Sequence, residues 1–140
     1  MGRRTYEVFA AAWPTRSGDA LSGRMNAIQK VVVSSTLTKP SWNNTSLING
    51  DLVGEITRLK QQPGKDIVQY GLGQVSFTLL AHRLFDEVRL WVHPLILGAA
   101  GPKAPHFLLC PTTQFQLTNI RTLSNGVVIL SFAPQASVKS

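Results

Sequence analysis

The run Lys30-Val31-Val32-Val33-Ser34-Ser35 constrains the fold of this chain more than any other feature of its sequence. Its apolar residues are continuous and β-branched, so the strand that they predict should be buried on both faces. Strands of this kind are typical of parallel sheets, in which a helix carries the chain from one strand to the next. The run therefore predicts an α/β fold with a mainly parallel sheet flanked by helices.

Helices are predicted before and after this strand in the sequence, at 4–13, 20–28, 52–62 and 74–83. Asp19 and Asp51 have the position and the chemistry of N-caps for the second and third of them. The first and last should bury apolar residues that recur at helical spacing: Tyr6, Phe9, Ala10 and Trp13, then Val75, Leu79 and Leu80.

Further strands are predicted at 46–48, 66–70 and 87–92, and a hairpin of 115–123 and 127–132 ends the pattern. Asn125-Gly126 is the hairpin signal, and it predicts an antiparallel C-terminal edge. Because a helix separates the apolar segments 28–35 and 66–70, we expect them to be parallel neighbours or near-neighbours in one sheet. The chain is interpreted as a single domain over residues 1–140.

Length and composition fit a cytoplasmic protein. The 140 residues are 44% hydrophobic, which is enough for a core, but no apolar run is long enough to cross a bilayer. The single cysteine, Cys110, cannot form an internal disulfide, which favours a reducing compartment. We therefore expect no membrane association.

The net charge of +7 does not predict a nucleic-acid binder, because Arg3-Arg4 is the only adjacent pair of basic residues. A smaller phosphorylated ligand fits this charge better. No metal site is predicted, since His82, His93 and His106 have no partner at ligand spacing. Asp86-Glu87 is interpreted as a solvated turn, and no catalytic residue is assigned.

Three loops are candidates for binding an anion. Gly71-Leu72-Gly73-Gln74-Val75 lies between a predicted strand and a predicted helix, where backbone amides favour a phosphate. It is not the dinucleotide fingerprint, because Ser76 stands where that pattern has its third glycine. A plain tight turn is the alternative.

The other two loops have the same kind of position. Gly2-Arg3-Arg4-Thr5 begins a helix with two guanidinium groups that can bind phosphate oxygens, or that simply lie in solvent. Ser34-Ser35-Thr36 follows the carboxyl end of the buried strand, where ligands of parallel sheets bind, although a polar loop without function is common there.

Four segments, taken in order, resemble the dihydrofolate reductase-like superfamily. More closely, they resemble its branch containing the C-terminal reductase domain of the bifunctional riboflavin-biosynthesis deaminase/reductase, and the resemblance covers nearly all of the chain. The segments are Gly2-Arg3-Arg4-Thr5-Tyr6-Glu7, Lys30 to Thr36, Gly71-Leu72-Gly73-Gln74, and Asp86-Glu87-Val88-Arg89-Leu90-Trp91-Val92-His93-Pro94-Leu95-Ile96-Leu97-Gly98.

The resemblance implies an NADPH-dependent oxidoreductase that transfers hydride to a small-molecule substrate. In the riboflavin branch this substrate is a ribosylamino-pyrimidine phosphate, whose ribose is reduced to ribityl. By position in the family, Gly2 to Thr5 would meet the cofactor phosphates and Gly71 to Val75 would hold the pyrophosphate. Ser34 to Thr36 would lie near the adenosine 2′-phosphate, with Arg3 opposite. The resemblance names no proton donor in this chain.

Family members normally begin with a central strand, an active-site loop and a helix before the segment that matches Gly2 to Thr5. We therefore expect an N-terminally shortened member with little reductase turnover by itself. A sheet without its central strand should either dimerise across the gap, giving a homodimer, or fold poorly. The alternative is a non-catalytic nucleotide-binding or structural remnant of the family.

Overall fold

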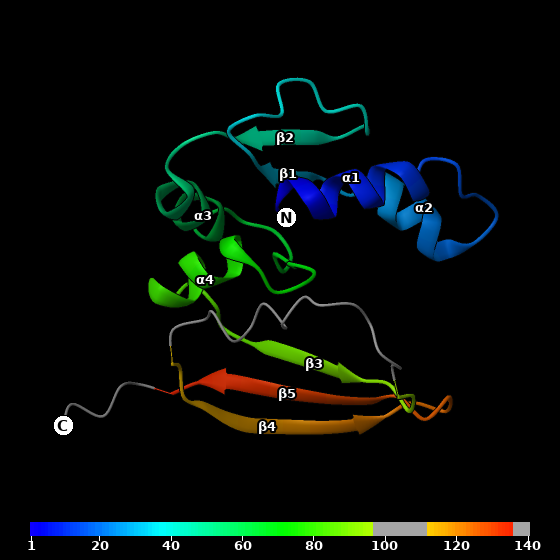
Figure 1. Ribbon diagram of the computed structural model, residues 1–140, viewed down its shortest axis with the longest axis vertical. Coiled ribbons are helices and arrows are strands. Elements are labelled where there is room, and N and C mark those ends of the chain that lie inside the picture. Colours follow the sequence, from blue (N-terminus) through cyan, green and yellow to red (C-terminus); the bar gives the residue numbers. More distant parts are fainter. Residues whose placement is uncertain (97–111, 136–140) are drawn as a thin grey trace. The chain divides into compact units, whose positions relative to one another are not determined.

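The computed structural model describes residues 1–96 and 112–135, and the chain divides into two compact units, Met1–Thr78 and Leu79–Ser140 (Figure 1). His106, Cys110 and the last two residues of the fourth family segment, Leu97 and Gly98, lie outside the described residues. One domain over 1–140 remains a prediction. Among the described helices, none combines the length and the apolar character that crossing a membrane requires.

The first unit is built around a pair of parallel strands. Helices α1 (Arg3–Ala12) and α2 (Ala20–Ala27) precede β1 (Lys30–Val33) and β2 (Thr45–Ile48), and α3 (Leu52–Lys60) and α4 (Gln74–Ala81) follow. The register pairs Lys30 with Thr45 and Val33 with Ile48. The positions of these four helices confirm the spacing and capping signals in the sequence.

The core of this unit lies where α1 and α2 pack on β1. Its buried residues are Tyr6, Met25, Val32 and Trp42, with Phe9, Ala10 and Trp13 packed against them. The apolar stripe predicted on the first helix therefore does face the core. Val32, at the centre of the apolar run, has no exposed surface.

Trp42 ties the long connection between β1 and β2 to both helices. Its backbone nitrogen donates to the Tyr6 hydroxyl at 2.9 Å, and its indole Nε1 donates to Asn26 Oδ1 at 2.7 Å. Asn26 Nδ2 in turn donates to the carbonyl oxygen of Trp13 at 3.0 Å. Each polar group that this core buries therefore has a partner, which avoids the cost of burying it alone.

The predicted strand at 66–70 is wrong, and so is its parallel pairing with 28–35. Residues 66–70 have no regular structure, and no described residue pairs with their backbone. Ile67 and Val68 are 53% and 67% exposed, while the Tyr70 ring packs on Phe9 of α1 at 5.8 Å between centroids. Strand propensity acts only where a neighbouring backbone is available to pair, and here β1 has β2 on one edge.

On its other edge, β1 meets the start of the chain instead. Val33 N donates to Met1 O at 2.9 Å, and Gly2 forms an isolated parallel bridge with Val33. The described parallel sheet is thus a single pair of strands rather than the larger parallel sheet that the sequence predicts.

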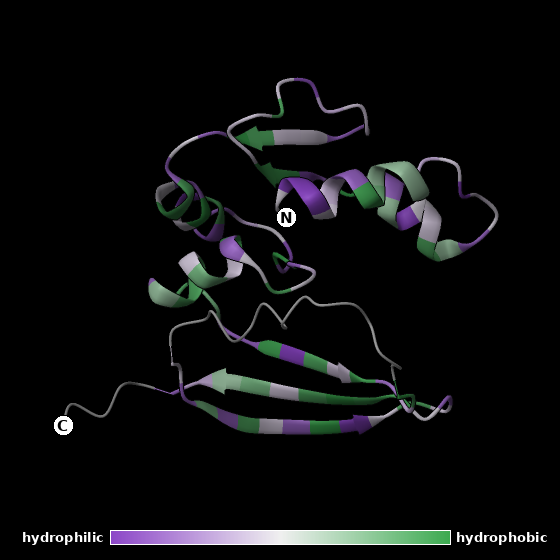
Figure 2. Ribbon diagram, in the orientation of Figure 1, coloured by the Kyte–Doolittle hydropathy of each residue, from purple (hydrophilic) through white to green (hydrophobic). Residues whose placement is uncertain are grey.

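The second unit contains an antiparallel sheet in the order β3-β5-β4, with β3 at Val88–Val92, β4 at Phe115–Thr122 and β5 at Val128–Pro134 (Figure 1). The hairpin and the antiparallel C-terminal edge are as predicted, and Gly126 at its turn has a φ of +84°. The register and the bulge between Leu117 and Asn119 place apolar residues of all three strands on one face. Strand β5 is apolar along most of its length (Figure 2).

Candidate functional site

The three candidate loops gather at the carboxyl end of β1. Gly2 forms a parallel bridge with Val33, so the residues that follow them, Arg3 and Ser34, lie at the same end of β1. A Cβ atom placed on Gly2 would lie 3.6 Å from Val75 Cγ2, which brings the start of α1 against the start of α4. The starts of α1 and α4, about seventy residues apart in the sequence, therefore meet. They meet at the carboxyl end of a parallel strand, which is where ligands of open parallel sheets bind.

The glycine loop, Gly71 to Gly73, precedes α4 and is open on its outer side. Gly71 has a φ of +78°, a conformation that favours glycine, and a Cβ on Gly71 or Gly73 would meet no atom within 4 Å. Leu72 and Gln74 are exposed, and Val75 is half-buried. The first helical hydrogen bond of α4 runs from Phe77 N to Gly73 O at 3.0 Å.

The start of α1 carries the two arginines of the second loop. Arg3 and Arg4 are exposed and Thr5 is half-buried. Arg3 Nη1 lies 3.5 Å from Glu7 Oε1, one helical turn further on. An exposed pair of this kind is weak, so a phosphate could replace Glu7 as the partner of Arg3.

In the serine loop, Ser34 to Thr36, the hydroxyl groups have two different roles. Ser34 is 8% exposed, and its Oγ accepts hydrogen bonds from Thr36 N at 3.2 Å and Leu37 N at 2.9 Å. Ser34 therefore shapes the turn, while Ser35 and Thr36 are exposed and can meet a ligand. The sequence could not distinguish these tasks, because all three residues have the same chemistry.

The four described helices differ in how they begin. Helices α2 and α3 are capped by carboxylates, since Asp19 accepts from Ser22 N and Asp51 accepts from Gly54 N, each at 2.9 Å. Helices α1 and α4 begin after Gly2 and Gly73, which have no side chain to cap them. The two helices that begin after a glycine are the two whose starts lie together, and the amides at a helix start attract an anion.

A pocket of about 400 Å³ adjoins the start of α4. Apolar side chains from the ends of β1, α3 and α4 form part of its wall, and Asp51, Gln74 and Thr78 add polar groups. Sequence reasoning identified the Gln74 and Val75 part of this wall but missed the part formed by residues 50–53. Asp51 was recognised as a helix cap, which gave no signal of a pocket.

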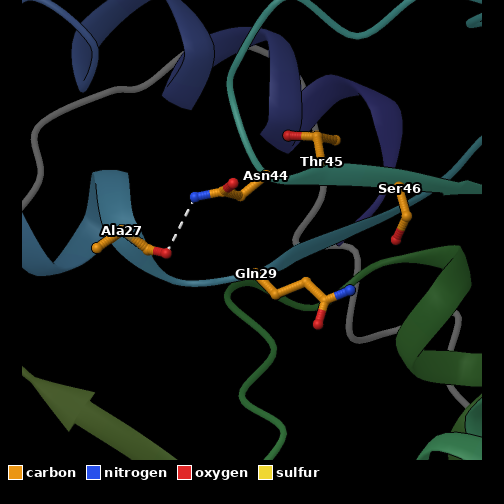
Figure 3. Close-up of a pocket in the computed structure, with 5 residues that line it drawn as sticks. All are labelled: Ala27, Gln29, Asn44, Thr45 and Ser46. Carbon is orange, nitrogen blue, oxygen red and sulfur yellow. Dashed lines mark hydrogen bonds between the residues drawn. The ribbon is translucent and has the colours of Figure 1, made fainter.

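A second, more polar pocket of about 510 Å³ lies at the other end of the strand pair (Figure 3). It is lined by residues that precede or begin β1 and β2: Ala27, Gln29, Asn44, Thr45 and Ser46. The Asn44 side chain donates to Ala27 O at 3.1 Å, so its amide serves the turn before β2. No predicted site residue lines this pocket. Among residues 1–96 and 112–135, no group of three or more His, Cys, Asp or Glu could hold a metal ion.

Comparisons with known proteins identify a curated relative and a similar solved structure. The chain is 37% identical over 89 residues to the uncharacterized protein YyaP of Bacillus subtilis (strain 168), a match that covers 61% of this chain and 45% of YyaP. The chain therefore spans less than half the length of that relative. A crystal structure of a Shewanella sp. PV-4 protein assigned to riboflavin biosynthesis superimposes with a TM-score of 0.65 at 17% identity, covering 97% of this chain and 72% of that one.

The structural likeness confirms the α/β, dihydrofolate reductase-like fold that the sequence predicts. A family model described as the RibD C-terminal domain matches residues 1–129, which include all three candidate loops and most of the terminal hairpin. The chain therefore belongs to the RibD C-terminal domain family.

Proposed function

We propose that this chain binds NADPH at the carboxyl end of β1 and is a reductase of the riboflavin-biosynthesis type. The substrate class is a ribosylamino-pyrimidine phosphate, whose ribose takes the hydride. The observation that carries the proposal is the meeting of two helix starts that each follow a glycine, Gly2 and Gly73, within one unit. Family membership supports the choice of cofactor.

The residues at this place fit a dinucleotide phosphate. Open space above Gly71 and Gly73 lets a phosphate approach the backbone, where a larger residue would block it. The neighbouring pocket of about 400 Å³ combines apolar walls with polar groups, which suits the adenosine part of the cofactor. Bound NADPH supplies the hydride, and the protein supplies its orientation.

Each loop has a separate task in this proposal. The first-turn amides of α4 hold the diphosphate, and those of α1 add a second set of donors. Arg3, with the exposed hydroxyls of Ser35 and Thr36, binds the adenosine 2′-phosphate. Ser34 keeps the turn in shape through its bonds to the Thr36 and Leu37 amides.

Titration calorimetry with NADPH and NADH tests this assignment. We expect the protein to prefer NADPH, and Arg3→Ala to weaken NADPH binding about tenfold while NADH binding stays the same, because charge-assisted hydrogen bonds are worth about 1.5–3 kcal/mol. Arg24→Ala, at an exposed position of α2, is the matched control and should change neither affinity. Equal affinities for the two cofactors would contradict the role of Arg3.

Turnover separates the reductase from its alternative. NADPH oxidation with a ribosylamino-pyrimidine phosphate would support catalysis by this chain. Tight NADPH binding without oxidation would instead support the non-catalytic nucleotide-binding remnant.

A further inference from the structure

Ser76 stands where a dinucleotide fingerprint has a glycine, and the structure gives this serine a defined task. It is the third residue of α4, and it has no exposed surface. Its hydroxyl donates to Gly71 O at 3.2 Å and accepts from Gly73 N at 3.3 Å and from Gln69 Nε2 at 2.7 Å. A hydroxyl has one proton and two lone pairs, so these contacts use all of its capacity.

These bonds fix the glycine loop from its inner side. The oxygen of Gly71 and the amide of Gly73 both point to one buried atom, which holds the left-handed conformation of Gly71 between them. The Gly73 amide is thereby withdrawn from any ligand. The outer face of the loop, where nothing lies within 4 Å of either glycine, is left to receive one.

Gln69 completes this arrangement at a cost. Its Oε1 is buried, and no described residue donates to it. A buried acceptor without a donor destabilises the folded state. An apolar side chain would avoid that cost, so the amide has its explanation in the bond that Nε2 makes to Ser76 rather than in stability.

We propose that Ser76, supported by Gln69, is a positioning residue that holds Gly71 to Gly73 in the shape that receives the cofactor diphosphate. The inference rests on the proposed function. Neither side chain touches the cofactor, and both act through the backbone of the loop. A loop that is held before binding need not be ordered during binding, which preserves affinity.

Ser76→Ala tests the role against an unusually close control, Ser22→Ala. Ser22 is also the third residue of its helix and also has no exposed surface, and its hydroxyl bonds to Asp19 O at 3.0 Å and Asp19 Oδ2 at 2.7 Å. Both variants should lower the melting temperature. Only Ser76→Ala should weaken NADPH binding, by about tenfold, the order of cost for re-ordering one backbone residue.

A ligand without a diphosphate shows whether the loss of affinity in Ser76→Ala comes from the glycine loop. Adenosine 2′-monophosphate should bind to wild type and to Ser76→Ala with equal affinity, because it does not reach the glycine loop. A loss of affinity for this probe as large as that for NADPH would overturn the proposal, since it would show general damage to the unit.

Gln69→Met provides a second test if Ser76→Ala folds poorly. Methionine keeps the size of the side chain but removes both the orphaned oxygen and the bond to Ser76. We expect an unchanged or higher melting temperature together with NADPH binding about threefold weaker, a combination that a merely structural role does not produce. Unchanged NADPH affinity in both variants would overturn the positioning role alone, whereas a wild-type protein that does not bind NADPH would overturn the proposed function with it.

Discussion

Neighbouring side chains strongly lower the pKa of Glu87, a carboxylate on the surface. Arg89 Nε and Nη2 donate to its two oxygens at 2.7 and 2.9 Å. The hydrogen bond from Arg89, followed by one from Ser131, lowers the pKa of Glu87 from 4.5 to about 2. Because the folded pKa lies below the unfolded one, the ionised carboxylate stabilises the fold above pH 4.5.

That contribution should be lost as the pH falls from 4.5 towards 2. Glu87 is 39% exposed, so we expect a loss of only about 0.5–1 kcal/mol in the free energy of unfolding. Urea denaturation of wild type and Glu87→Gln between these pH values measures it, and the glutamine variant should lack this part of the pH dependence. Parallel curves for the two proteins would show that the pair contributes nothing.

Single residues were predictable from sequence where chemistry alone decided their role. Asp19 and Asp51 cap the expected helices because a carboxylate before an apolar run has few other uses there. Ser76 was read as a departure from a glycine pattern, since its value depends on Gly71 and Gly73 folding around it. A buried hydroxyl leaves no periodic signal in a sequence.

At the scale of elements, Lys30 joins α2 to β1. Its ammonium group donates to the carbonyl oxygens of Met25, Asn26 and Ile28 at 3.1, 3.1 and 2.8 Å, and it lies 4.3 Å from the centre of the Trp42 ring. The side chain is almost completely buried, and burial lowers the pKa of Lys30. A cation at this place satisfies carbonyls that the end of α2 leaves open.

Lys30→Met should therefore lower the free energy of unfolding by about 2–3 kcal/mol, because it leaves buried carbonyls without a donor. Lys39→Met, in the exposed part of the connection between β1 and β2, is the control and should stay within about 0.5 kcal/mol of wild type. Chemical denaturation of the three proteins gives both values. A loss at Lys30 as small as that at Lys39 would show that water replaces the ammonium group.

Elements whose sequence signal is local were predicted correctly. A strand that needs a distant partner strand, as expected at 66–70, was not. The hairpin of β4 and β5 follows from Asn125-Gly126 and its flanking apolar residues, all within one short stretch. Residues 66–70 have a strand-like composition, but a strand exists only when another backbone pairs with it. No local pattern contains that information.

At the scale of the whole molecule, every residue proposed to bind the cofactor lies within Met1–Thr78. Hydrogen exchange should therefore show slower exchange on adding NADPH at 1–5 and 71–78, and unchanged exchange in the strands β4 and β5. Amides that bind a ligand or begin a newly capped helix open less often. Slower exchange confined to 115–134 would place the binding site in the other unit.

The two helices that begin after glycines have first-turn amides that water can solvate, and a bound phosphate would accept hydrogen bonds from them in place of that water. Under the proposed function, each tenfold rise in free NADPH above its dissociation constant would add about 1.4 kcal/mol to stability. In a cell, proteases remove the less stable, empty form first. The lifetime of this protein would then follow the total concentration of the cofactor, reduced and oxidised together, because both forms carry the phosphates that the site is proposed to bind.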